Sequence, residues 1–371
     1  VKTPRPRNHW DNQPADIKVN RMKTIISELP EHDNIILGDK NDLDCMLAGM
    51  IIEEFNSKIV YAVYVNNTWT SFCSYATDYD CTQYVDAPGC TDCPAIKSPE
   101  HAQKHITQNL IDKNYSSFKH FVEKYKNNII LNVGSSSSMD EANQSFLFKD
   151  IEKVLIPLKN VWSPESGMET LLQRRAEAKK RIISQVQTYF PGRQIDHIIL
   201  WSALEPTIYR KGFDYLRESL ENVENLENTV VILAGHPHKF KLLVDKQPLP
   251  GITLIGGLLD REQYTNILLA SDLYCCTTLG DCGPRTIGEA LALGTPVTSF
   301  DKCIAVDLVN KNNGHIAPSR NSVELSKGIN KILKLSAPEK KEYSINCIKS
   351  YNKFYSDDLI TKRWQMVLGK I

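Results

Sequence analysis

The stretch that decides the fold covers residues 269–300 and reads LASDLYCCTTLGDCGPRTIGEALALGTPVTSF. Its short apolar run at 273–277 predicts a buried strand. A turn cluster follows at 280–283, and Pro284 then suits the first residue of a helix, because its φ is fixed and its missing N–H is not needed there. Gly294 ends this helix, and the next strand opens at Pro296. The stretch therefore predicts a strand–loop–helix–strand unit.

Two acidic residues give this unit its chemistry. Asp281 lies in the predicted loop and Glu289 on the helix, with seven residues between them. The amides of Gly283, Arg285 and Thr286 lie at or near the free helix N-terminus, where unpaired N–H groups and the helix dipole favour an anion. The unit thus offers a phosphate seat and two carboxylates that accept hydrogen bonds from hydroxyls, as a sugar nucleotide requires. The alternative is an ordinary βαβ unit with an exposed acid pair.

The same residues resemble a known family. The acid pair followed by EALALGTPV, at 289–297, is similar to retaining GT-B glycosyltransferases of family 4. The longer pattern D-x-x-P-x-T-x-x-E-A-L-A-x-G-T-P-V most resembles the branch that builds capsule, colanic-acid-like and O-antigen polysaccharides. The resemblance implies an α/β protein with two Rossmann-like domains whose parallel sheets face a cleft. It also implies a UDP- or GDP-sugar donor, retention of the anomeric configuration and no metal for catalysis.

A second motif supports the same resemblance. The run YRKGF, at 209–213, follows a predicted strand at 198–203 and resembles the family's RKGF motif, whose lysine binds the donor phosphate. The resemblance assigns Lys211 to the phosphate, Glu289 to the ribose and Asp281 to the hydroxyls of the donor sugar. His236, after a predicted strand at 229–235, either meets the donor or lies on a loop surface. The remaining expected donor-binding residues are Ser202, Arg210, Gly283, Pro284, Arg285 and Thr286.

The N-terminal half departs from the family at one catalytic position. Residues 66–94, NNTWTSFCSYATDYDCTQYVDAPGCTDCP, resemble a family segment that begins LHDMW and ends C-x-x-C-P. Trp69 matches, but Asn66-Asn67 replaces the family's His-Asp. Asparagine cannot act as a general base, although it donates and accepts hydrogen bonds. We therefore expect Asn66 to orient the acceptor hydroxyl while the donor phosphate takes its proton, so that the catalytic set is Lys211, Asp281, Glu289 and Asn66.

Four cysteines in this segment have the spacing of a metal site. The pattern Cys73-x7-Cys81-x8-Cys90-x2-Cys93 can place four thiolates around one tetrahedral ion. In a reducing compartment this spacing favours zinc over disulfides. Such an ion would be structural, since four thiolates leave no open position for a substrate. Free buried thiols and two disulfides remain alternatives.

The alternation of predicted strands and helices divides the chain into two parts. We expect a linker or the edge of a longer protein at 1–20 and a short, acceptor-side Rossmann-like domain at 21–167, with a Cys-rich loop at 73–93. A nucleotide-sugar-binding domain is expected at 168–350, and a helix that crosses back to the first domain at 351–371. The Ser-rich turn at 135–138 either caps a helix starting near Met139 or contacts a sugar.

Composition excludes several classes of partner. The chain has 371 residues with 44 Lys and Arg against 44 Asp and Glu, so no excess of basic charge favours nucleic acid or an anionic membrane. No apolar run is long enough to span a bilayer, and no signal peptide opens the chain. We expect a cytoplasmic protein, at most peripherally associated with the inner face of a membrane. Its expected partners are a nucleotide sugar and a glycan or lipid-linked glycan.

The sequence thus predicts a retaining hexosyltransferase of surface polysaccharide biosynthesis. One alternative is a catalytically degenerate nucleotide-sugar-binding module of a larger glycosyltransferase, which the short N-terminal half and Asn66 favour. The other is a GT-B sugar-nucleotide epimerase, whose chemistry requires several acid and base residues that the sequence does not offer.

Overall fold

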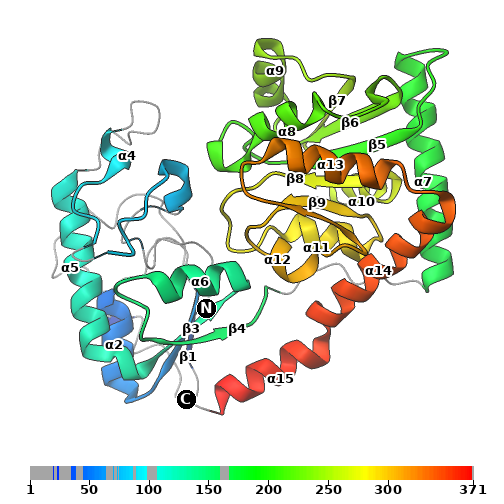
Figure 1. The fold of residues 1–371 in the computed structure, drawn as a ribbon. Coiled ribbons are helices and arrows are strands. Elements are labelled where there is room, and N and C mark those ends of the chain that lie inside the picture. Colours follow the sequence, from blue (N-terminus) through cyan, green and yellow to red (C-terminus); the bar gives the residue numbers. More distant parts are fainter. Residues whose placement is uncertain are drawn as a thin grey trace.

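The computed structural model describes residues 20, 23–24, 35–38, 45–63, 70, 73, 75–86, 89–97, 107–158 and 167–369. Over these residues the chain forms two parallel β-sheets, one in each half (Figure 1). This arrangement confirms the predicted α/β class with two sheets. Asn66, Asn67, Trp69 and the N-terminal segment 1–19 lie outside the described residues. No helix in the described ranges is both long and apolar enough to cross a membrane.

The N-terminal sheet has the strand order β1-β2-β3-β4, and each strand is parallel to its neighbour. Residues such as Ile59 and Leu131 pack with Ile52 and Phe121 from the helices on one face. The strands are β1 (Ile35–Gly38), β2 (Ile59–Ala62), β3 (Ile129–Val133) and β4 (Glu152–Leu155). The helices and 3₁₀ turns are α2 (Cys45–Phe55), η1 (Ala76–Tyr79), α4 (Pro94–Lys97), α5 (Gln108–Tyr125), η2 (Lys126–Asn128) and α6 (Ser136–Gln144).

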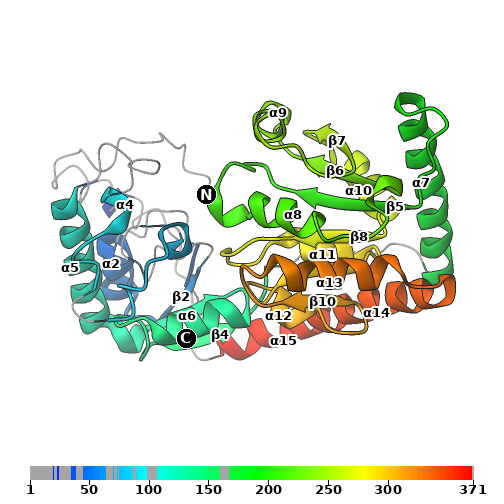
Figure 2. The same ribbon diagram turned by 45° about the horizontal axis from the view of Figure 1, so that its top comes forward.

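The C-terminal sheet has the order β10-β9-β8-β5-β6-β7. Its strands are β5 (His197–Ser202), β6 (Thr229–Ala234), β7 (Ile252–Gly257), β8 (Leu273–Cys276), β9 (Val297–Phe300) and β10 (Gly314–Ala317). Its helices and turns are α7 (Met168–Tyr189), η3 (Tyr209–Lys211), α8 (Phe213–Leu220), η4 (Leu226–Asn228), α9 (Pro237–Lys246), α10 (Arg261–Ala270), α11 (Arg285–Ala292), α12 (Ala305–Leu308) and α13 (Ser322–Leu333). Figure 2 shows α5 and α7 at opposite ends of the molecule.

Both faces of the C-terminal sheet are covered, so its central strands are continuously apolar. In β5, Ile198 and Leu200 belong to a cluster that includes residues of α7, α10 and α11. The alternate residues Ile199 and Trp201 belong to a second cluster, with residues of α8, α9 and α13. Successive side chains of a strand point to opposite faces, which explains this division. The strand order reverses at the β8–β5 pair, and ligands of open α/β sheets bind outside the strand ends at such a point.

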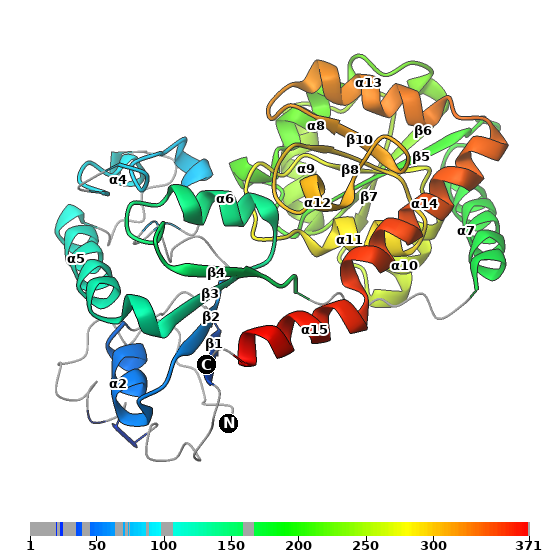
Figure 3. The same ribbon diagram turned by 60° about the horizontal axis from the view of Figure 1, so that its bottom comes forward.

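The last two helices connect the halves. Helix α14 (Ala337–Tyr355) packs against α11, and α15 (Asp357–Leu368) continues toward the N-terminal sheet (Figure 3). Ile360 and Val367 of α15 belong to the same apolar cluster as Val60 and Ile130 of β2 and β3. Helix α15 therefore lies toward the sheet face opposite the one that packs with α2 and α5.

Direct polar contacts also join the two halves. The backbone N–H of Ser136 donates to Asp307 Oδ2 at 2.9 Å, and its hydroxyl donates to the other carboxylate oxygen. A Cβ atom on Gly134 would lie 2.7 Å from the carbonyl oxygen of Cys282, so only glycine permits this approach. The end of β3 thus lies directly against the loop that carries Asp281.

Two predicted helix starts need correction. Helix α11 begins at Arg285, and Pro284 is its N-cap with φ of −61° rather than its first helical residue. Helix α6 begins at Ser136, three residues before the predicted Met139. The capping interpretation of the Ser-rich turn is confirmed, because the hydroxyl of Ser135 accepts a hydrogen bond from Ser138 N at 3.1 Å.

Candidate active site

A cavity of about 960 Å³ lies beyond the carboxyl ends of β5, β6 and β8. The topological switch point of the C-terminal sheet falls here. Its volume is at the upper end of the usual range for small-molecule sites, about 300–1,000 Å³. The cavity brings together most of the residues predicted from the sequence: Ser202, Arg210, Lys211, Asp281, Gly283, Pro284, Arg285, Thr286 and Glu289.

A compact charged cluster forms one side of the cavity. Lys211 Nζ donates to Asp281 Oδ2 at 2.9 Å, and a guanidinium nitrogen of Arg210 lies 3.5 Å from the same oxygen. The three side chains are 14–21 % exposed, so their charges are only partly screened by solvent. The two cations hold Asp281 in place and leave a net positive charge in this part of the site.

The N-terminal half contributes a side chain to this cluster. The guanidinium carbon of Arg210 lies 4.0 Å from the ring centroid of Tyr75, within the range of a cation–π contact. Burial raises the pKa of Tyr75, and the negative charge of Asp281 adds to that shift. Tyr75 is thus a neutral phenol at pH 7 and places the Cys-rich segment directly beside the cavity.

The first turn of α11 has the features of an anion seat. Its N-cap, Pro284, has no side-chain group that can accept from the first amides of the helix. Gly283 has φ of 145°, a conformation that other residues rarely adopt, and its N–H donates to Asp281 Oδ1 at 3.3 Å. The loop therefore brings the helix N-terminus to the cavity wall while linking it to the charged cluster.

Hydroxyl groups form another part of the lining. Ser202 Oγ lies 3.0 Å from the hydroxyl of Tyr264 and 3.1 Å from that of Tyr274. Tyr274 donates in turn to Thr286 Oγ1 at 2.8 Å. Burial raises the pKa of both tyrosines, which therefore remain neutral donors and acceptors. This chain of hydroxyls joins the end of β5 to the first turn of α11.

Glu289 lies on α11 in the same wall of the cavity. Burial raises the pKa of its carboxyl group, while Arg285 and Arg261 act in the opposite direction. A carboxyl group with a shifted pKa in a cavity is a candidate for a functional role. Glu289 is thus placed to accept hydrogen bonds from a ligand, and ligand contacts that favour its charged form would compensate for its burial.

His236 lies beside the cavity rather than among its lining residues. Its Nε2 is 3.6 Å from Glu205 Oε1, and Glu205 itself lines the cavity and is paired with Lys239. Asn66, the predicted acceptor residue, lies outside the described residues.

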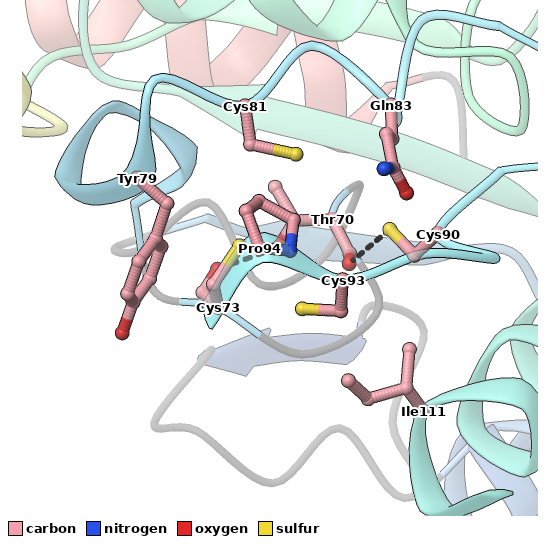
Figure 4. Close-up of a pocket in the computed structure, with 9 residues that line it drawn as sticks. All are labelled: Thr70, Cys73, Tyr79, Cys81, Gln83, Cys90, Cys93, Pro94 and Ile111. Carbon is pink, nitrogen blue, oxygen red and sulfur yellow. Dashed lines mark hydrogen bonds between the residues drawn. The ribbon is translucent and has the colours of Figure 1, made fainter. Parts of the chain in front are cut away.

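The four cysteines of the N-terminal segment line a second, much smaller cavity of about 10 Å³ (Figure 4). None of the four forms a disulfide in this structure, so the alternative of two disulfides considered from the sequence is not observed. Burial raises the pKa of Cys73 to about 12, and the neighbouring thiols add to this shift. Within the described ranges no three His, Cys, Asp or Glu side chains are already arranged to hold a metal ion.

The fold is that of GT-B glycosyltransferases, an α/β fold with two parallel sheets. Residues 204–350 match the family model described as "Glycosyl transferases group 1", so the C-terminal half contains a domain of this family. A comparison with curated protein sequences finds no match.

Solved structures similar to this chain cover nearly all of it. Sucrose-phosphate synthase from Thermosynechococcus elongatus has a TM-score of 0.62 and 14% identity, over 94% of this chain and 76% of that one. HepE from Anabaena, solved in complex with UDP-glucose, has a TM-score of 0.61 and 15% identity, over 97% of this chain and 85% of HepE. TarM from S. aureus, solved with Fondaparinux, alpha-GlcNAc-glycerol and UDP, has a TM-score of 0.59 and 13% identity, over 94% of this chain. The chain spans 58% of TarM's length.

Proposed function

We propose that this protein is a retaining glycosyltransferase that moves a sugar from a nucleotide-sugar donor to a hydroxyl of a glycan acceptor in surface polysaccharide biosynthesis. One observation carries the proposal: Lys211, Asp281, Glu289 and the start of α11 converge on one cavity at the topological switch point. The cavity thereby combines groups that can donate hydrogen bonds to a phosphate with carboxylates that can accept hydrogen bonds from hydroxyls. The glycosyl transferases group 1 match over 204–350 supports the same reaction class.

The donor pyrophosphate is proposed to lie at the first turn of α11. There the amides of Gly283, Arg285 and Thr286 and the ammonium of Lys211 would bind its oxygens. Lys211 is paired with Asp281 in this structure, so a phosphate would compete with that carboxylate. The lone pairs of the Asp281 carboxylate would then be available to accept hydrogen bonds from hydroxyls of the donor sugar.

The nucleoside is proposed to bind further along α11. Glu289 would accept hydrogen bonds from the ribose hydroxyls, and Ser202 would contact the donor from the end of β5. We propose a UDP-sugar as donor, because the similar structures of HepE and TarM were solved with UDP-glucose and UDP. A GDP-sugar is the alternative that the experiment below compares.

Retention of configuration is proposed to follow from attack of the acceptor on the face that the phosphate leaves. The leaving phosphate would take the acceptor proton, and Asn66 would orient the acceptor hydroxyl. The protein would act by positioning the reactants and by stabilising the charge that develops on the pyrophosphate. Lys211, Arg210 and the dipole of α11 are the groups proposed to provide that stabilisation.

The acceptor is proposed to be a glycan or lipid-linked glycan, which would place the enzyme in the cytoplasm at the inner face of a membrane. The test begins with thermal shifts of the full chain in UDP-, GDP- and dTDP-sugars. The best donor is then incubated with oligosaccharide and lipid-linked acceptors, and products are analysed by mass spectrometry and NMR. A product with the anomeric configuration of the donor is the expected result.

Other outcomes distinguish the alternatives. Nucleotide binding without transfer to any acceptor would indicate a degenerate binding module. An epimerised donor would indicate a sugar-nucleotide epimerase. Failure of every nucleotide sugar to bind would reject the donor site itself.

A further inference from the structure

The Cys-rich segment at 70–97 has little regular structure and few buried apolar side chains of its own. Its described part contains two helical turns of four residues each, η1 and α4. Around the cysteines, a small apolar cluster consists of Cys90 and Cys93 with Ile111 of α5, against which Tyr79 and Ile96 pack in part. Tyr75 and Tyr84 pack instead with the core of the N-terminal sheet. Irregular segments of this length are uncommon in compact domains, and small units with little core usually need a cross-link or a metal.

The four cysteines come from three turns and meet at one cavity. Cys73 precedes η1, Cys81 follows it, and Cys90 and Cys93 precede α4. Figure 4 shows Cys81 across the cavity from Cys93, with Cys73 and Cys90 beside them. Its volume of about 10 Å³ is close to that of one water-sized sphere. The cavity is therefore about the size that a single ion occupies.

The backbone around this cavity is already held in place by two glutamine side chains. Gln108 of α5 donates to Cys90 O at 2.8 Å and accepts from Cys93 N at 3.1 Å. Gln83 donates to Asp92 O at 2.6 Å and accepts from Asp92 N at 3.2 Å. Gln108 and Gln83 thus hold the backbone of the turn that carries Cys90 and Cys93. Gln83 itself lies two residues from Cys81. The spacing of Cys90 and Cys93 therefore does not depend on a ligand.

We propose that this cavity is a structural zinc site with the thiolates of Cys73, Cys81, Cys90 and Cys93 as its four ligands. Four sulfur ligands satisfy the tetrahedral preference of Zn²⁺, and soft thiolates select it over magnesium or calcium. Cys90 at present donates to Thr70 O at 3.1 Å, so this thiol must lose its proton and turn inward on binding. The other side chains must also turn toward the ion, while the hydrogen bonds of Gln83 and Gln108 hold the backbone between Cys90 and Cys93.

The ion would stabilise a part of the N-terminal half that touches the candidate active site. Tyr75, two residues after Cys73, packs on Arg210, and Asp80, the residue before Cys81, pairs with Arg320. Both contacts reach the C-terminal half from within the span that the four ligands enclose. The zinc ion would therefore have a structural role. It would stabilise the segment whose residues Tyr75 and Asp80 contact the C-terminal half.

The first test is elemental analysis of the full chain, purified under reducing conditions from cells grown with zinc. About one zinc per chain is expected. Cys93→Ser should lose most of it. Cys45→Ser should keep it, since Cys45 is a half-buried cysteine of α2 that does not line the cavity.

The second test does not depend on a variant that could fail to fold. Metal-free wild-type chain is titrated with Co²⁺, and a thiolate-to-cobalt charge-transfer band with tetrahedral d–d intensity is expected, together with protection of four thiols from a thiol reagent. A metal-free purified chain with four reactive thiols and no cobalt band overturns the proposal. Disulfides among the four cysteines, or iron in place of zinc, also overturn it. UDP binding by the same preparations tests the donor site separately.

Discussion

At the scale of single residues, the half-buried carboxyl group of Glu289 leads to a direct prediction. If it accepts hydrogen bonds from ribose hydroxyls, Glu289→Gln should weaken UDP binding by about 1.5–3 kcal/mol, the range for hydrogen bonds to charged groups. Isothermal titration calorimetry measures this change. Equal affinity of the two proteins for UDP would remove Glu289 from the site.

The raised pKa of Glu289 adds a pH dependence to the same experiment. Hydrogen bonds from the ribose favour the ionised carboxyl group and lower its pKa, so UDP binding should release a proton at pH values between the bound and free pKa. UDP affinity should then fall as the pH is lowered through the raised value of the free protein. Calorimetry in buffers of different ionisation enthalpy should detect a larger proton release in the wild type than in Glu289→Gln.

Lys211 is expected to matter more for the reaction than for the fold. Its ammonium group pairs with Asp281, which keeps Arg210 as a second partner in Lys211→Ala. The variant should therefore unfold at nearly the wild-type temperature but lose about 10²–10³-fold in transfer rate, as for the loss of one charge-stabilising donor. The control is Lys241→Ala, an exposed position on α9. Wild-type turnover in Lys211→Ala would show that the lysine does not stabilise the leaving phosphate.

At the scale of elements, Asp272 holds helices α7 and α14 to the ends of β5 and β8. Its buried carboxylate accepts from Lys179 Nζ at 2.7 Å and from Ile198 N at 2.9 Å, with Lys340 at 3.4 Å. Asp272→Ala leaves Lys179 without its carboxylate partner, although its hydrogen bond to Asp196 O remains, and should destabilise the C-terminal half by about 3 kcal/mol. Urea unfolding measures this loss. Lys334→Ala, which breaks an exposed pair with Glu224, should change stability by less than about 1 kcal/mol.

The same carboxylate should make the C-terminal half sensitive to acid. Burial alone would raise the pKa of Asp272, but Lys179, Lys340 and the Ile198 amide outweigh it and lower the pKa. The stability that Asp272 contributes is therefore present above the ordinary pKa of an aspartate and is lost as the pH falls through the lowered value. An acid-unfolding curve of Asp272→Ala that has the wild-type shape would contradict this assignment.

Most elements could be predicted from sequence, because parallel strands buried on both faces appear as short apolar runs between helices. The helix at Met168–Tyr189 and the strands around Ser202 and Gly257 illustrate this. The tyrosines of the site could not be predicted in this way. Tyr274 lies inside an apolar strand. A buried tyrosine hydroxyl needs a hydrogen-bond partner, and this requirement is the one feature of the sequence that indicates a polar group at the strand end. Tyr75 reaches Arg210 only through the packing of the two halves, which no local pattern specifies.

At the scale of the whole molecule, the proposed function divides donor and acceptor between the halves. In this proposal the donor contacts would lie almost wholly in the C-terminal half, whose residues form most of the cavity lining, whereas Asn66 belongs to the N-terminal half. Asn66→Ala should therefore reduce transfer while leaving the dissociation constant for UDP unchanged, and parallel kinetics and calorimetry test this. Asn66→His restores a group of pKa near 6.5 at this position and should make transfer depend on pH. The division is wrong if Asn66→Ala weakens UDP binding as much as Glu289→Gln does.

The contact of α15 with the N-terminal sheet has a consequence for how the protein is made. Val60 and Ile130 on one face of this sheet are buried in the same apolar cluster as Ile360 and Val367 of α15. During synthesis on the ribosome these strands emerge long before that helix, so an apolar surface of the nascent chain stays open to water until α15 has been translated. The N-terminal half is therefore expected to complete its folding only after α15 has left the exit tunnel. In the cell, this order makes the unfinished chain a natural client for chaperones that shield exposed apolar surface.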